Sequence, residues 1–193
     1  MSSDRYFFVL ESPNKIKKVA SIVGNDFNVV ASKGHIRTLG TKKILGINIE
    51  KQFEPTYYVD NNKANVVNML RNVYTYDCNK DYIYIATDLD REGEAIGWHV
   101  AQILEVPHHK IKRLKYQEIT KKALLEAIKN PIQLDMNLVN SQQARVIMDK
   151  MIGYQLSPLL WQQFNNYHLS AGRIQVAVNK LIIERENEIA QFQ

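Results

Sequence analysis

Tyr82-Ile-Tyr-Ile-Ala-Thr-Asp-Leu-Asp-Arg-Glu-Gly-Glu-Ala-Ile96 joins an apolar run of strand length to an acidic turn and the start of a helix. Apolar residues then recur at the i, i+4, i+7, i+8 spacing that buries one helix face, at Ile96, Val100, Ile103 and Leu104. A strand that leads through a short turn into a helix is the repeating unit of α/β folds. The segment therefore predicts this fold class.

The N-terminal part repeats the order of strand, turn and helix. Tyr6-Phe-Phe-Val-Leu10 is a continuous apolar run, and Ser12-Pro13 supplies an N-cap residue and a proline suited to the first helical position. Apolar residues at helical spacing continue to Val23, and Gly24 is placed to end the helix. A second strand is predicted from Phe27 to Ser32. Together these units predict an open, mainly parallel sheet flanked by helices.

The rest of the chain predicts one more strand–helix alternation and then helices alone. Residues 38–62 lack periodicity, which indicates a long loop with a short strand at Tyr57–Val59. The elements expected after it are a helix marked by Val66, Leu70 and Val73, a last strand at Lys112–Tyr116, a helix capped by Thr120 and ended by Asn130-Pro131, and a helix over 138–152 with a buried stripe of Ala144, Met148, Met151 and Ile152. We therefore expect an α/β domain over residues 1–130 and an all-α segment over residues 131–193.

Composition narrows the partners and the compartment. The chain has 193 residues and a formal charge of +5, which favours polyanionic partners such as nucleic acid or an anionic membrane surface. Its single cysteine, Cys78, excludes an internal disulfide and is typical of an intracellular protein. No signal-peptide pattern and no apolar stretch of about twenty residues is present, so we expect neither Sec secretion nor a membrane span.

Carboxylates follow the two clearest strand patterns. Glu11 comes directly after the first apolar run, and Asp88, Asp90 and Glu92 come directly after the run that ends at Thr87. Both turns are expected at the carboxyl edge of a parallel sheet, where open α/β sheets bind ligands. Because gathered carboxylates repel one another, a hard cation such as Mg²⁺ would stabilise them. The alternative is that acids simply favour the N-termini of helices.

Several motifs together resemble one protein family. Three stretches are similar to the signatures of the catalytic TOPRIM domain of type IA DNA topoisomerases: Glu11-Ser-Pro-Asn-Lys15, Lys33-Gly-His-Ile-Arg37 and Ala86-Thr-Asp-Leu-Asp-Arg-Glu-Gly-Glu-Ala-Ile96. Later stretches follow the same family's order: Gln117-Glu-Ile-Thr-Lys121, Val139-Asn-Ser-Gln-Gln-Ala-Arg145, Asp149, Gly153-Tyr154, Ser157-Pro158, Leu160-Trp161 and Ser170-Ala-Gly-Arg-Ile-Gln175. The resemblance covers nearly the whole chain. Four residues depart from it: Leu89 stands where proline is usual, Val146 and Lys150 where arginines are common, and Val176 where serine is usual.

The resemblance implies roles for the acidic residues and their neighbours. It implies that Glu11, Asp88 and Asp90 hold Mg²⁺ with Glu92 close by, and that Lys15 lies near the scissile phosphate. Glu11, Lys15 and Glu92 are thereby the expected catalytic residues. From the residues themselves, a lysine one turn into a helix suits a phosphate oxygen, and a glycine-containing turn with His35 and Arg37 suits phosphate contact.

A second set of residues is implied to contact DNA. The resemblance places Arg145 and Asp149 at a single strand, with Tyr154 and Trp161 along its path; aromatic rings stack on unpaired bases with little sequence preference. A plain i, i+4 surface ion pair and a core tryptophan are the alternatives. Small, cationic and polar side chains suited to a phosphate-backbone clamp make up the last stretch: Ser170, Ala171, Gly172, Arg173, Ile174 and Gln175.

The implied activity is relaxation of negatively supercoiled DNA. Type IA enzymes break one strand by attack of a tyrosine, form a 5′-phosphotyrosyl link and reseal the strand without ATP. None of the ten tyrosines has the proline and arginine neighbours of that nucleophile. We therefore expect an N-terminal fragment that is inactive in cleavage alone, with two partners: DNA, mainly single-stranded, and the missing gate domains.

The expected location is the cytoplasm or nucleoid, or a nucleus or viral factory. Two alternative functions stay open at this point. One is another TOPRIM enzyme, a primase or nuclease, and the other is a non-enzymatic module that binds single-stranded DNA.

Overall fold

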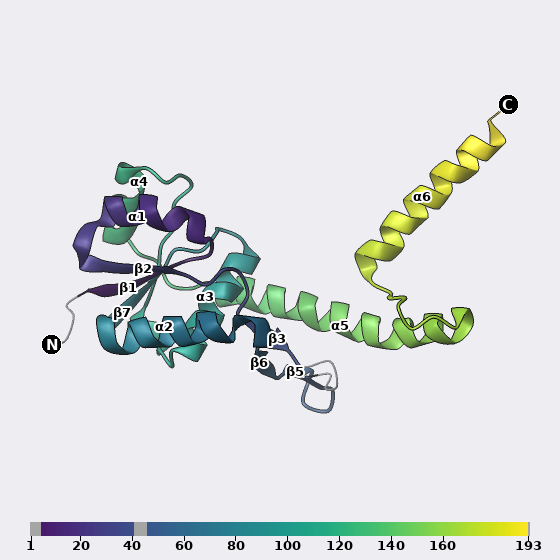
Figure 1. Ribbon diagram of the computed structural model, residues 1–193, viewed down its shortest axis with the longest axis horizontal. Helices are drawn as coiled ribbons and strands as arrows, with labels where there is room; N and C mark the ends of the chain where they lie inside the picture. The colour runs from purple at the N-terminus through teal and green to yellow at the C-terminus, as the bar shows by residue number, and fades with distance from the viewer. Residues whose placement is uncertain (1–4, 41–45, 193) are drawn as a thin grey trace. The chain divides into compact units, whose positions relative to one another are not determined.

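The computed structural model describes residues 5–40 and 46–192 (Figure 1). Part of the loop predicted over 38–62 and the ends of both predicted domains therefore lie outside the described residues. Contacts divide the chain into two compact units: Met1–Thr38 with Tyr57–Gln143, and Leu39–Thr56 with Ala144–Gln193. This division falls at Gln143, and the boundary near residue 130 stays a prediction.

The first unit is built on a four-stranded parallel sheet with the strand order β2-β1-β7-β8. Its strands are β1 (Tyr6–Leu10), β2 (Phe27–Ala31), β7 (Asn79–Ile85) and β8 (Ile111–Arg113). In β1, Val9 pairs with Val30 on one side and with Ile85 on the other. The order confirms the open parallel α/β fold. It also places β1 and β7 together at the point where the sheet changes winding direction.

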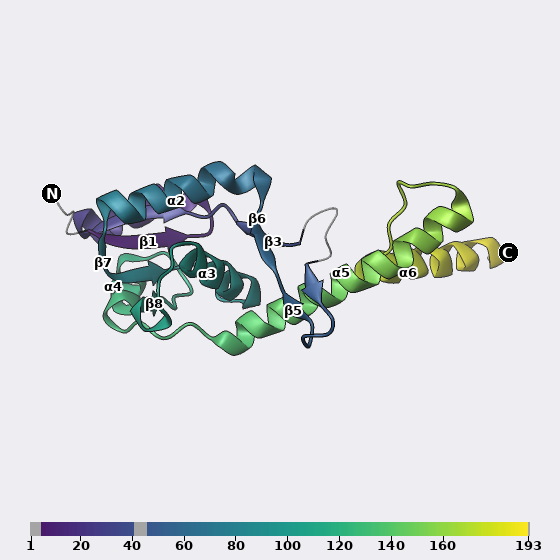
Figure 2. The same ribbon diagram turned by 90° about the horizontal axis from the view of Figure 1, so that it is seen from below.

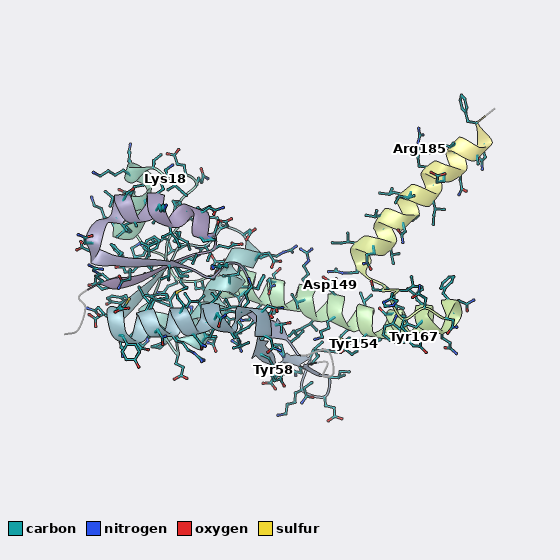
Figure 3. All side chains as sticks on the ribbon, viewed as in Figure 1. Lys18, Tyr58, Asp149, Tyr154, Tyr167 and Arg185 are labelled. Carbon is teal, nitrogen blue, oxygen red and sulfur yellow. The ribbon has the colours of Figure 1, made fainter. Side chains whose placement is uncertain are left out.

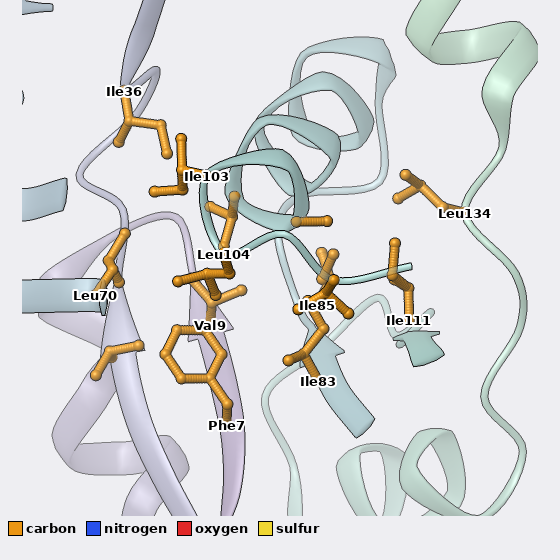
Figure 4. Packing of buried hydrophobic residues seen from close by; sticks show 14 of the residues in the cluster. Phe7, Val9, Ile36, Leu70, Ile83, Ile85, Ile103, Leu104, Ile111 and Leu134 are labelled. Carbon is orange, nitrogen blue, oxygen red and sulfur yellow. The ribbon is translucent and has the colours of Figure 1, made fainter. Parts of the chain in front are cut away.

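Both faces of this sheet are covered by helices. α2 (Ala64–Asp77) and α3 (Arg91–Ile103) pack on the face of Phe7 and Val9, and Figure 4 shows that packing at close range. α1 (Ile16–Val23) and α4 (Lys121–Lys129) pack on the face of Phe8 and Leu10 (Figure 1). Successive residues of a strand point to opposite faces, so a strand buried on both faces reads as a continuous apolar run.

Two helix signals in the sequence, Gly24 and Thr120, correspond to observed helix ends, and a third, Ser12, does not. Gly24 ends α1 with φ 77°, a backbone conformation that glycine adopts without a Cβ penalty. The Thr120 side chain caps α4 by accepting a hydrogen bond from the Ala123 amide. Ser12 makes no capping bond, because Pro13 opens a 3-10 turn rather than the α-helix. The short 3-10 segments are η1 (Pro13–Lys15), η2 (Gly24–Asp26), η3 (Asn61–Lys63) and η4 (His108–Lys110).

Two regions differ from the sequence predictions. The strand predicted at Lys112–Tyr116 is β8, which begins at Ile111 and ends at Arg113. Arg113 pairs with Ile85 of β7 and also forms an antiparallel bridge with Ile132. The predicted loop contains short strands in its described part. These are β3 (Arg37–Leu39) paired with β6 (Tyr57–Val59), and β4 (Ile47–Asn48) antiparallel to β5 (Glu54–Pro55), several of which are labelled in Figure 2. The strand expected at Tyr57–Val59 is thus confirmed.

The second unit is mainly helical. α5 (Met136–Phe164), whose first residues belong to the first unit, is longer than the predicted 138–152, and α6 (Arg173–Gln191) follows it. The predicted buried stripe of α5 is wrong, since Ala144 is exposed and Met148 is 48% exposed. Apolar residues occur on several sides of this helix, so their spacing alone identified a face that is not buried. Among residues 5–40 and 46–192, no helix is long and apolar enough to cross a membrane.

Candidate metal and DNA site

The acidic residues follow two adjacent parallel strands. Glu11 comes directly after β1, and the acidic turn that begins at Asp88 comes three residues after the end of β7. The Ala86 amide still donates to the Val9 carbonyl oxygen at 2.9 Å, so the two chains remain paired up to the turns. Both turns therefore leave the sheet at the same carboxyl edge, at the change of winding direction where open α/β sheets bind ligands.

The acidic turn is held tightly at the start of α3. Asp90 is the N-cap of α3, and its Oδ1 accepts a hydrogen bond from the Gly93 amide at 2.8 Å. The Thr87 hydroxyl donates to the Gly93 carbonyl oxygen at 2.7 Å. A Cβ on Gly93 would collide with the Asp88 carbonyl oxygen, so only glycine fits this close approach. These contacts fix the backbone positions from which the Asp88 and Asp90 side chains extend.

Glu11 lies close to the negative charges of Asp88 and Asp90. Burial raises the pKa of the Glu11 carboxyl, and the nearby charges of Asp88 and Asp90 raise it further, while Lys15 and His35 lower it. Lys15 Nζ lies 2.9 Å from Asp88 Oδ1. Positive charge near these carboxylates therefore stabilises their ionised form, and a bound cation would act in the same way.

Glu92 is fixed by two partners. Its Oε2 lies 2.9 Å from His35 Nε2 and accepts a hydrogen bond from Gln142 Nε2 at 3.1 Å. Gln142 is buried, and its Oε1 has no hydrogen-bond partner among the residues that the structure describes. Both partners hold the same oxygen of Glu92. The motif Val139–Arg145 contained Gln142, but its spacing gave no reason to single out this glutamine.

The predicted metal ligands do not form a compact metal cage. In the part of the chain that the structure describes, no group of three or more His, Cys, Asp or Glu side chains is arranged to hold a metal ion. Each of the three carboxylates already has a partner in the protein: Asp88 pairs with Lys15, and Glu92 contacts His35. One oxygen of Asp90 accepts a hydrogen bond from the Gly93 amide. The oxygen donors suit a hard cation by their chemistry. Their role as ligands stays a prediction.

Arg37 is held by aromatic rings in the same unit. Its guanidinium carbon lies 5.3 Å from the centre of the Tyr57 ring and 5.7 Å from that of Trp98. Burial lowers the pKa of Arg37, and cation–π contacts of this kind stabilise a partly desolvated guanidinium. His99 packs against Tyr57 with a ring-centre separation of 4.6 Å. Arg37 is thus a half-buried cation, and its contact with DNA stays a prediction.

In the second unit, Asp149 connects two arginines. Its Oδ1 accepts from Arg173 Nε at 2.5 Å, and its Oδ2 lies 3.8 Å from Arg145 Nε. The hydrogen bond from Arg173 is the main cause of a lowered Asp149 pKa. The pair predicted within the helix therefore exists, but the closer partner of Asp149 comes from the start of α6. Figure 3 labels Asp149 on α5.

The aromatic and loop residues of this unit lie close to one another. Trp161 Nε1 donates to the Leu169 carbonyl oxygen at 2.6 Å, and its ring centre lies 6.0 Å from that of Tyr167. The Ala171 amide donates to the Ser157 hydroxyl, while Ser170 and Gln175 bond to each other. Gly172 precedes α6 and Ile174 is exposed.

Lys150 takes a place that the sequence did not reveal. Its ammonium lies 5.8 Å from the centre of the Tyr154 ring and donates to the Leu39 carbonyl oxygen. A lysine that binds a backbone carbonyl 111 residues away gives no local signal. Tyr154 is 43% exposed, and Figure 3 labels it on α5.

Comparison with known proteins identifies the family. A family model described as "Toprim domain" matches residues 7–119, more than half of the chain. The chain belongs to the Toprim family. A second model, described as "DNA topoisomerase", matches residues 133–193. Toprim domains are known to bind metal ions.

One curated relative and one solved structure extend this Toprim assignment. The chain is 45% identical over 186 residues to DNA topoisomerase 1 of Thermotoga maritima. The structure of full-length topoisomerase I from the same organism matches with a TM-score of 0.81 and 42% identity, over 97% of this chain. The chain spans 28% of the curated relative and 31% of the solved chain. These matches confirm the resemblance to type IA DNA topoisomerases.

Proposed function

We propose that this chain is the metal- and DNA-binding part of a type IA DNA topoisomerase that relaxes negatively supercoiled DNA. The observation that carries the proposal is the meeting of the Glu11 and Asp88 turns at one edge of the sheet, at its change of winding direction. The carboxylates of these two turns repel one another, and a bound cation would remove that cost. A cation held by carboxylates typically serves phosphoryl-transfer chemistry.

Glu11, Asp88 and Asp90 would hold Mg²⁺, with Glu92 beside them. The donor set supports this assignment, because the bond that caps α3 uses Oδ1 of Asp90 and not its Oδ2. A bound Mg²⁺ would neutralise charge on a DNA phosphate. His35 and Gln142 hold one oxygen of Glu92 and leave the other oxygen outside these two bonds, where it can accept or pass a proton.

Lys15 supplies a mobile positive charge for the same phosphate. Its ion pair with Asp88 is partly exposed, and such pairs are weak enough to exchange partners. His35 and Arg37 add positive or hydrogen-bonding groups from the neighbouring loop and strand. The rings that hold Arg37 reduce the freedom that its side chain would lose on binding a phosphate.

The second unit supplies contacts for single-stranded DNA. Arg145 and Arg173 would bind phosphates when they leave Asp149, and Tyr154 and Trp161 would stack with bases. The loop and helix start complete the proposed contact set: Ser170, Ala171, Gly172, Arg173, Ile174 and Gln175. Their amides and small side chains allow a phosphate backbone to come close.

The nucleophilic tyrosine and the gate domains would come from further parts of the same polypeptide. The partners are therefore DNA, mainly its single-stranded segments, and those domains. The expected place of action is inside the cell, where this DNA lies. On this proposal the chain by itself prepares a phosphate and holds a strand without cutting it.

Fluorescence anisotropy with a labelled single-stranded oligonucleotide tests the proposal. We expect weak binding that Mg²⁺ strengthens in the wild-type chain but not in D88N/D90N, and no covalent DNA adduct. Binding without any influence of Mg²⁺ or of the substitutions would favour a purely structural DNA-binding module. A covalent adduct formed by this chain would contradict the assignment of the nucleophile to another domain.

A further inference from the structure

A fully buried arginine lies behind the acidic turn. Arg113, on the edge strand β8, is 0% exposed, and its Nε donates to Glu94 Oε1 at 2.7 Å. Glu94 belongs to the first turn of α3 and is itself buried. Charged side chains are seldom fully buried unless they are paired, and Glu94 is the charged partner that allows Arg113 to be buried.

The guanidinium of Arg113 also binds the backbone of the acidic turn. Its Nη1 donates to the Thr87 carbonyl oxygen and its Nη2 to the Asp88 carbonyl oxygen, each at 2.7 Å. Two weaker contacts of 3.3 Å reach the carbonyl oxygens of Ile85 and Leu114. The planar fork thus spans two consecutive carbonyls at the point where the chain leaves the sheet.

Arg113 could neutralise Glu94 without its hydrogen bonds to the carbonyl oxygens of the acidic turn. One N–H would be enough for Glu94 Oε1, and the other carboxylate oxygen already accepts from the Asp135 amide at 3.3 Å. A buried ion pair also contributes little net stability once desolvation is counted. The two short bonds to Thr87 and Asp88 are the part of the arrangement that a lysine could not reproduce.

The Asp88 carbonyl oxygen is constrained by two groups. Arg113 Nη2 binds it, and the Gly93 backbone lies so close to it that a Cβ on Gly93 would collide with it. The orientation of this peptide sets the direction in which the Asp88 carboxylate leaves the backbone. Its distance from Glu11 and Lys15 depends on that direction.

We propose that Arg113 is a positioning residue for the acidic turn: by holding the Thr87 and Asp88 carbonyls it aims the Asp88 carboxylate at the metal site. The metal part of this inference rests on the proposed function. The positioning part concerns the turn itself and can be measured without a metal. Groups that orient metal ligands from behind are often as important to the metal as the ligands.

The variant R113K separates positioning from charge. It keeps a positive charge for Glu94 but loses the double grip on the turn, so the Gly93 amide should exchange its hydrogen faster than the change in global stability accounts for. Calorimetric titration should show about 10- to 100-fold weaker Mg²⁺ binding. R71K is the matched control, because Arg71 also donates to a backbone carbonyl, that of Ile103 at 3.2 Å, away from the turn.

A second variant keeps the test decisive if R113K does not fold. R113M/E94M replaces the pair by apolar side chains, an exchange that buried ion pairs often tolerate, and it should show the same two changes. Wild-type exchange at Gly93 in a folded variant would overturn the proposal. If the wild-type chain binds no Mg²⁺, the proposed metal site fails, and the exchange of Gly93 alone decides the role of Arg113.

Discussion

Lys15 and Asp88, 73 residues apart, form an ion pair in which Nζ lies 2.9 Å from Oδ1. The pair links the turn after β1 to the turn after β7, so one ammonium neutralises part of the charge that both turns gather. The two side chains are 38% and 57% exposed, which leaves them free to exchange partners with water or with a ligand.

The first prediction concerns the competition between this lysine and a cation. In K15Q, Asp88 loses its positive neighbour, so Mg²⁺ should bind more tightly by about two- to fivefold, the value of an exposed ion pair. K18Q is the control, since Lys18 lies on the exposed side of α1 (Figure 3). Titration calorimetry of both variants at low salt measures the effect, and weaker Mg²⁺ binding in K15Q would show that Lys15 does not compete for Asp88.

Gly93 supports a prediction about close packing. G93A should be destabilised by about 2–4 kcal/mol, because its Cβ has no room beside the Asp88 carbonyl oxygen. In G153A the nearest described atom to the new Cβ would be the Ala171 carbonyl oxygen, at an ordinary 3.5 Å. That variant should gain about 0.5–1 kcal/mol, the usual difference between alanine and glycine within a helix. Urea unfolding curves for the two variants decide the matter, and equal stabilities would contradict it.

Asp149 restrains the two arginines that we assign to DNA. In D149N, Arg145 and Arg173 lose a negative partner, so single-stranded DNA should bind more tightly. The plot of log K against log salt should become steeper by roughly 0.7 for each arginine that gains a phosphate. E188Q removes a similar exposed pair, that with Arg185 at 2.7 Å, and should leave the slope unchanged. A slope in D149N equal to that of the wild type would argue against phosphate binding by these arginines.

His99 predicts the response of stability to acid. Burial lowers the pKa of this histidine to about 3, and the charges of Arg37 and His35 act in the same direction. Above the unfolded pKa near 6.5 both states are neutral at this residue, and stability is unaffected. Below pH 6.5 His99 is protonated in the unfolded chain, whereas in the folded chain it stays neutral down to about pH 3. Stability should therefore fall by up to about 1.4 kcal/mol per pH unit across this window.

Thermal unfolding between pH 7.5 and pH 4 measures the contribution of His99. The acid slope of H99F should be smaller than that of the wild type, because the difference between the two proteins isolates this residue from the carboxylates. H168F changes an exposed histidine and should keep the wild-type slope. An unchanged slope in H99F would show that His99 is protonated in the folded state.

Local signals predicted much of the first unit. The apolar run that became β1 is buried on both faces, and the run that became β7 is buried at Ile83 and Ile85. The acidic turn begins a helix as expected, with Asp90 as its cap. These features depend on neighbouring residues, so periodicity and capping residues reveal them. The meeting of Glu11 and Asp88 followed from a general property of parallel sheets.

Long-range pairing explains what the sequence did not reveal. Arg113 lies in a short edge strand, where an arginine is usually solvated, and only its pairing with Glu94 and the turn carbonyls buries it. Gln142 binds Glu92 across 50 residues. Met148 is exposed although its spacing indicated a core position, because the period of a helix gives a face and not the partner that covers it.

The most direct measurement is a calorimetric titration of Mg²⁺ into the wild-type chain, D88N/D90N and D77N/D81N. The last variant makes the same change of charge at two exposed aspartates outside the acidic turn. We predict saturable binding by the wild type and by D77N/D81N, and none by D88N/D90N. Equal Mg²⁺ affinity in D88N/D90N and the wild type would contradict a metal site at the edge of the sheet where β1 and β7 end.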